Sequence, residues 1–132
     1  MTLKIADGYN NIAGLVELAP QGKTPGVMPG RFTMGGDKHI YEDGYPSLDI
    51  EYEALTDAQL NTLLGQAGLT GTTRSNEVTI EAPRNHDRQV SNWNAIVRYP
   101  ELTRDGRHDR FFWRNVKFHF HGLVALDEGA YY

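Results

Sequence analysis

Phe118-His119-Phe120-His121 contains the residues whose types and spacing most directly suggest chemistry. On a β-strand, side chains two positions apart point to the same face, so His119 and His121 could share one metal ion. A complete site would need a third ligand, and the candidates are His39, His86, His108 and Glu51. The other interpretation is that both histidines, with Lys117, form a polar strand face opposite acidic residues on a neighbouring strand. Two ligands without a recognisable third favour this second interpretation, so no metal site is predicted.

Three carboxylates, Asp49, Glu51 and Glu53, alternate along one predicted strand. A glycosidase needs two carboxylates that face each other across a cleft, whereas these lie along the same strand face. We therefore predict a solvated or charge-paired face. The chain also lacks the nucleophile-elbow, P-loop and dinucleotide-binding motifs. The sequence predicts a protein that is not an enzyme and uses no cofactor.

A basic cluster lies near the C-terminal end, beside aromatic residues. Its basic members are Arg104, Arg107, His108, Arg110 and Arg114, and the aromatic ones are Phe111, Phe112 and Trp113. Such a cluster could bind a nucleic-acid backbone while its rings stack on bases. Asp105 and Asp109 interrupt it, however, and the whole chain has a net charge of −4. Salt bridges to a neighbouring protein are therefore the favoured interpretation.

The composition is that of one globular domain, spanning residues 1–132, with 39% hydrophobic and 23% charged residues. The charge is uneven. Residues 1–73 contain four Lys/Arg and nine Asp/Glu, while residues 74–132 contain nine and eight. Surfaces of opposite sign would suit contact between copies of the chain. There is no cysteine, which excludes disulfides and thiol catalysis, and no apolar run approaches the roughly 20 residues of a membrane span.

The stretch from Ser47 to Gly68 predicts the clearest structural unit, a strand that runs directly into a helix. Leu48, Ile50, Tyr52 and Ala54 alternate with the three carboxylates, which is typical of a half-buried strand. Thr56 and Gln59 then form a capping box, followed by apolar residues at helical spacing. We expect the helix over about residues 56–67, ended by Gly68 in a left-handed conformation and packed on the sheet.

The remaining segments predict short strands joined by loops. We expect strands at 12–18, 77–81, 92–99 and 111–126, with a bulge at Gly122 and with Val116, Phe118, Phe120, Val124 and Leu126 on one face of the last strand. Residues 20–36 are rich in Gly and Pro, which indicates an extended loop or arm with a brief strand at 31–34. The charged segments 84–89 and 103–110 suit hairpin tips. The predicted fold is α+β, a mostly antiparallel β-sandwich or small β-barrel with one packed helix.

Three stretches together resemble the small structural proteins of long-tailed bacteriophages, the group of tail-tube, distal-tail and λ-type minor tail proteins. Gly30-Arg31-Phe32 and Glu42-Asp43-Gly44-Tyr45 look like the turns before their main strand. The unit at 47–68, with Leu-Thr-Asp-Ala-Gln opening the helix, looks like their strand followed by a helix. Finally, 78–80, 93–100 and 112–126 look like the closing strands.

The resemblance implies a structural virion protein, most consistent with a tail or tail-tip component that forms a homo-oligomeric ring. Its partners would be copies of itself and other tail proteins, with passive contact to DNA in a channel and none to a membrane. It would act in the virion tail, after a period in the host cytoplasm. The expected subunit-interface residues are Arg31, Phe32, Arg84, His86, Arg88, Arg104, Arg107 and Arg110. Asp49, Glu51 and Glu53 would face the lumen, where like charge lets DNA pass.

Two alternatives stay open. A capsid decoration protein belongs to the same class and would bind the head of the particle instead. A small metal-dependent β-barrel enzyme belongs to a different class and depends on His119 and His121 alone.

Overall fold

Two antiparallel sheets and one α-helix make up the part of the chain that the computed structural model describes, namely residues 3–28, 31–34, 40–43, 46–70, 72–84, 89–100, 102 and 112–126, with backbone alone at 31–34 and 40–43. The order along the chain is β1 (Lys4–Asp7), a 3-10 turn η1 (Ile12–Gly14), β2 (Val16–Glu17), β3 (Arg31–Met34), β4 (Ile40–Asp43), β5 (Leu48–Leu55), α1 (Asp57–Gln66), β6 (Ser75–Pro83), β7 (Val90–Arg98) and β8 (Trp113–Ala125). The α+β class expected from the sequence is confirmed.

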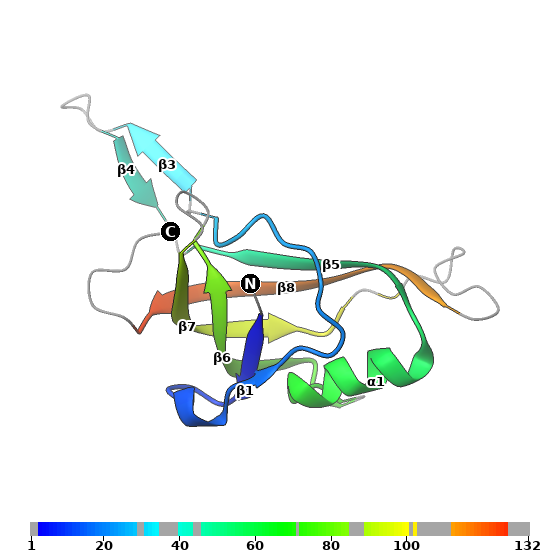
Figure 1. The fold of residues 1–132 in the computed structure, drawn as a ribbon. Coiled ribbons are helices and arrows are strands. Elements are labelled where there is room, and N and C mark those ends of the chain that lie inside the picture. The colour runs from blue at the N-terminus through cyan, green and yellow to red at the C-terminus, as the bar shows by residue number, and fades with distance from the viewer. Residues whose placement is uncertain are drawn as a thin grey trace.

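The larger sheet has six strands in the order β2-β1-β6-β7-β8-β5, and every neighbouring pair is antiparallel. It curls into a half-barrel, so that β5 and β8 run across the direction of β6 (Figure 1). The helix α1 lies against the sheet, as predicted. Side chains from β1, β5, β8 and α1, including Ile5, Tyr52, Leu63 and Phe120, line the interior between them.

The strand–helix unit forms as its sequence predicts. Leu48, Ile50 and Tyr52 are buried on one face of β5. The Thr56 side chain accepts a hydrogen bond from the Gln59 backbone at 3.2 Å, and the Gln59 side chain accepts one from the Thr56 backbone at 3.0 Å, which completes the capping box. At the other end, Gly68 takes a positive φ of 71°.

A bulge in β8 changes which residues face the core. Gly122 has a φ of +63°, and the register with β7 shifts between Asn94 and Ile96. The predicted bulge is confirmed, but the predicted face beyond it is wrong. The extra residue reverses the alternation, so Leu123 is 2% exposed and Val124, expected in the core, is 50% exposed.

The expected strand at 12–18 is also wrong in most of its length. Asn11 fixes a 3-10 turn there instead, because its carbonyl accepts from Gly14 and its side chain donates to the Asp7 carbonyl. Only Val16–Glu17 forms a strand, paired with β1. The strands β1 and β4 are not predicted from the sequence, because each has four residues, too few to show an alternation.

Residues 18–28, which we call the crossing segment, form an extended stretch that is fixed along the sheet by isolated backbone bridges, so from residue 20 on they are the extended loop of the prediction and not a free arm. The segment starts beside β1, where Leu18 donates to Leu3, and ends beside β5, where the backbones of Lys23 and Met28 pair with Glu51 and Ser47. It therefore links the two edges of the half-barrel. In the rest of the predicted loop or arm the structure describes only residues 31–34, which form β3 as expected and pair with β4.

Two glutamine amides hold the start of the crossing segment. The Gln21 side chain accepts from the Leu3 backbone at 2.8 Å and donates to the Leu3 carbonyl at 3.0 Å, which imitates a strand pair. Gln66, on α1, donates to the Glu17 carbonyl at 2.9 Å and accepts from Ala19. These side chains satisfy backbone groups that have no regular strand partner there.

Tyr52 also anchors the crossing segment, because its hydroxyl donates to the Pro20 carbonyl at 2.8 Å. We expect Tyr52→Phe to lower the free energy of unfolding by about 1 kcal/mol at pH 7, the usual net value of one such hydrogen bond. Tyr9→Phe is the control, because Tyr9 is 40% exposed and its substitution should change stability by less than about 0.5 kcal/mol. Urea denaturation of the three proteins measures the difference, and equal losses in both variants would contradict this role.

The Tyr52 anchor also predicts a dependence on alkaline pH. Burial raises the pKa of Tyr52 above its ordinary value of 10, because the anionic form is poorly solvated inside the fold. Below pH 10 the side chain is neutral in both the folded and unfolded states. Above it, the unfolded state releases the proton first, so this contribution to stability falls as pH rises. The stability gap between wild type and Tyr52→Phe should therefore narrow above pH 10.

Candidate functional site

The candidate site is the solvent-facing side of the β5–β8 pair, where acidic residues on one strand oppose basic residues on the other. The antiparallel register sets Asp49 opposite His119 and Glu51 opposite Lys117. Each strand alternates apolar and polar residues, so burial of one face forces these polar side chains onto the other. The predicted opposition is confirmed for His119 with Asp49 and for Lys117 with Glu51, whereas neither His121 nor Glu53 has a partner in the β5–β8 register.

The strongest polar contact on this face joins His119 to Asp49. His119 Nδ1 lies 2.6 Å from Asp49 Oδ1, and both side chains are about one-third exposed. Lys117 Nζ lies 3.5 Å from Glu51 and 3.9 Å from Asp49. Asp49 thus lies between a histidine and a lysine, which fixes the orientation of its carboxylate.

Lys23, from the crossing segment, extends the charged face past the edge of β5. Its Nζ lies 3.0 Å from Glu53 Oε1. The side chains of Lys23 and Glu53 are 80% and 82% exposed. An ion pair so open to water contributes little to stability. Its effect is on the surface, where it neutralises the third carboxylate.

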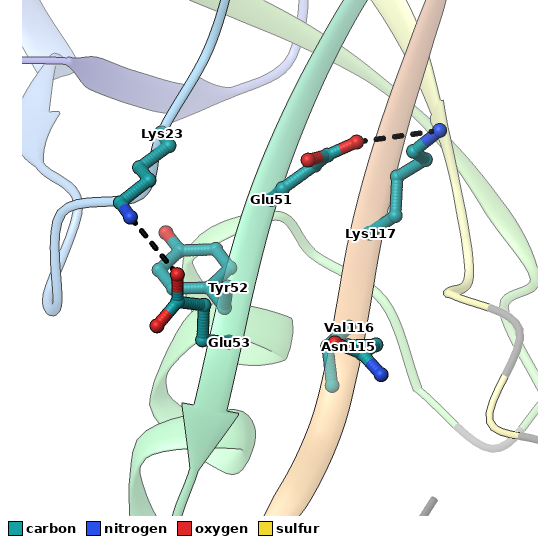
Figure 2. A pocket seen from close by; sticks show the side chains of 7 residues that line it. All are labelled: Lys23, Glu51, Tyr52, Glu53, Asn115, Val116 and Lys117. Carbon is teal, nitrogen blue, oxygen red and sulfur yellow. Dashed lines mark hydrogen bonds and ion pairs between the residues drawn. The ribbon is translucent and has the colours of Figure 1, made fainter.

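A shallow depression of about 340 Å³ lies among these charges. Figure 2 shows Lys23 paired with Glu53 on one side and Lys117 paired with Glu51 on the other. The remaining lining residues are Tyr52, Asn115 and Val116. The two carboxylates lie along one strand and each has its own lysine, so they do not form the facing acid–base pair that glycosidic cleavage requires.

His121 lies beside His119 on the same face of β8. Their rings are nearly parallel, at 16°, with centroids 5.9 Å apart. Partial burial, the neighbouring His119 and Arg98 all lower the pKa of His121, because each disfavours a positive charge on the ring. The lowered pKa of His121 favours the neutral form of its ring at pH 7.

No group of three or more potential metal ligands occurs within the described residues. Of the proposed third ligands, Glu51 lies close to Lys117 instead. His39, His86 and His108 lie outside the described residues.

The tentative interface residues are only partly described. Arg31 and Phe32 belong to β3, on the hairpin that pairs with neither edge of the large sheet. Arg84 follows β6, where its backbone pairs with Val27 and its guanidinium donates to Gln89 at 2.6 Å. His86, Arg88, Arg104, Arg107 and Arg110 lie outside the described residues. Of the basic cluster, Arg114 is described, and its guanidinium lies 5.0 Å from the centre of the Phe112 ring.

One polar network that the sequence does not predict lies on β6 and β7, the two central strands of the same sheet. Thr79 is fully buried on β6, accepts from the Asn11 backbone at 3.0 Å and donates to the Gly8 carbonyl at 2.8 Å. Asn94 on β7 exchanges two hydrogen bonds with Asn10. Nothing in the spacing of Gly8, Asn10 and Asn11 indicates that they cover the sheet.

No protein-family model, curated protein or solved structure matches this chain. Within the described part of the chain, no helix has the length and apolar character needed to cross a membrane.

Proposed function

We propose that the protein is a non-enzymatic structural subunit of a tailed phage or phage-like particle, in the tail or its tip, that assembles with copies of itself into a ring. The half-barrel with its crossing segment corresponds in this proposal to the small β-barrel expected from the sequence. Support comes from the order of strands and helix that carries the resemblance to tail proteins. The observation that carries the proposal most directly is the β3–β4 hairpin.

The β3–β4 hairpin is a separate two-stranded sheet that stands off the half-barrel (Figure 1). Its strands pair with each other, from Arg31 opposite Asp43 to Met34 opposite Ile40. Two strands alone are marginally stable in water, because they bury little apolar surface. A neighbouring subunit would supply the missing surface, and exposed strand edges favour such pairing.

The base of the hairpin allows a clean test. Met28 and Ser47 exchange two backbone hydrogen bonds, at 2.8 and 3.0 Å, so a two-residue Asn-Gly turn can replace residues 29–46 between them. We expect the full chain to form rings or short tubes, seen by light scattering on a sizing column and by negative staining. The shortened chain should keep a cooperative thermal transition but remain monomeric. Rings from the shortened chain, or a monomeric full chain at all concentrations, would refute the proposal.

The lumen position of Asp49, Glu51 and Glu53 stays a prediction within this proposal. Reversing their charges would set lysines against Lys23 and Lys117, so amides are the better substitution. We expect Asp49→Asn with Glu51→Gln and Glu53→Gln to leave ring assembly intact and to slow DNA passage, measured as infectivity or DNA delivery. Unchanged delivery by assembled particles would contradict the lumen assignment.

A head-bound location in labelled particles would instead favour the capsid decoration protein. The metal-dependent enzyme has less support, because the described residues bring only His119 and His121 together without a third ligand.

A further inference from the structure

We propose that His119 and His121 form a two-ligand chelate site for one borderline transition-metal dication, such as Cu²⁺, Ni²⁺ or Zn²⁺, with Asp49 as the residue that orients His119. Water would complete the coordination. The inference is independent of ring assembly, since all three side chains belong to β5 and β8 of one chain.

The first support is the placement of the two rings. They project from the same face of β8, nearly parallel, with centroids 5.9 Å apart. With the His119 ring held by Asp49, rotation of His121 about its side-chain torsions would bring its ring toward a common point above the strand. Imidazole nitrogens suit these three metals better than they suit Ca²⁺ or Mg²⁺, which prefer oxygen ligands.

The second support is the hydrogen bond from Asp49, which selects the tautomer of His119. With Nδ1 held 2.6 Å from the carboxylate, the proton of the neutral ring lies on Nδ1 and the lone pair lies on Nε2. Metal-binding histidines commonly have this arrangement, in which a carboxylate accepts from the nitrogen that does not bind the metal. The contact orients the ring and makes Nε2 a stronger ligand.

The third support is the lack of competing contacts at His121. Within the described part of the chain its ring nitrogens make no hydrogen bond, so neither nitrogen must leave a protein partner to bind a metal. The surrounding charges are mixed. Asp49 and Glu51 on β5 favour a cation, whereas Lys117 on β8 and Arg98 on β7 oppose it. Because the site has only two protein ligands and mixed charges around it, we expect it to bind metal with lower affinity than a structural zinc site.

The test is calorimetric titration of the purified chain with CuCl₂, NiCl₂ and ZnCl₂ in separate experiments. We expect one saturable site per chain, with Cu²⁺ bound more tightly than Ni²⁺ or Zn²⁺. His119→Ala and His121→Ala should each abolish saturable binding of Ni²⁺ and Zn²⁺. Asp49→Asn should weaken it by about 10- to 100-fold, as loss of an orienting carboxylate does elsewhere.

His86→Ala is the matched control, because it removes one imidazole from a chain that contains five and leaves the pair intact. It should bind each metal as wild type does. Circular dichroism verifies that every variant is folded. An absence of saturable metal binding in wild type would refute the site. So would folded His119→Ala and His121→Ala variants that bind the metals as tightly as wild type does.

Discussion

Replacing Leu123 with alanine should lower the free energy of unfolding by about 2–5 kcal/mol, the range for a leucine truncated in a packed core. Leu123 is 2% exposed and belongs to the core cluster that includes Phe120 and Trp93. The substitution removes buried methyl groups and leaves a cavity that the surrounding strands fill only in part. Chemical denaturation, with the midpoint and slope fitted together, gives the difference directly.

Val124→Ala is the matched control for Leu123→Ala, because the two residues are adjacent on β8 but lie on opposite sides of the sheet. Val124 is 50% exposed, so its truncation should change stability by less than about 0.5 kcal/mol. The comparison tests the bulge at Gly122 directly. Without the bulge the alternation would continue from Phe120, and Val124→Ala would be the costly substitution.

Gly22→Ala should destabilise the protein by about 1–3 kcal/mol, as overpacking of a close contact does. A methyl group added at Gly22 would lie 2.4 Å from Ile50 Cγ2, 2.8 Å from Tyr52 Cζ and 3.1 Å from the Glu51 carbonyl. Ile50 and Tyr52 are buried, so neither can move aside without disturbing the core. The crossing segment would have to lift away from β5, which would also strain the hydrogen bond from Tyr52 to Pro20.

Gly65→Ala is the opposite case in the same chain. Gly65 lies near the end of α1, and nothing lies within 4 Å of an added methyl group. Alanine is favoured over glycine in a helix by about 1 kcal/mol, so this variant should be as stable as wild type or more so. A destabilised Gly65→Ala, or a Gly22→Ala variant as stable as wild type, would contradict the packing described for these two positions.

The charged face and the core have different consequences for the proposed function. The Lys23–Glu53 and Lys117–Glu51 pairs are largely exposed, so their removal should alter surface recognition more than stability. Core substitutions such as Leu123→Ala should reduce assembly only as far as they reduce folding. Measuring both ring assembly and the free energy of unfolding for each variant distinguishes residues that contact a neighbouring subunit from residues that only stabilise the fold.

The sequence by itself determined the elements whose structure depends only on residues close together in the chain. The alternation in β5, the capping box at Thr56 and the glycine stop at Gly68 each depend on residues within one turn or one strand. The opposition of Asp49 and Glu51 to His119 and Lys117 of β8 could also be predicted, because two half-buried neighbouring strands must place their polar faces on the same side.

Only the tertiary structure decided which segments far apart in the chain pair with each other through backbone hydrogen bonds. The sequence leaves open whether the Gly/Pro-rich residues 20–28 form a loop on the domain or a free arm, because their partners, the β5 edge and the Pro83 carbonyl, are distant in sequence. The two-residue strand β2 and the four-residue β1 are too short to show a pattern, and their pairing comes from the sheet that they join. At Gly122 the glycine could be identified as a bulge, but the register with β7 fixed the side on which Leu123 and Val124 lie. One added residue reverses every later side chain in a strand, and only the paired strand sets where that reversal occurs.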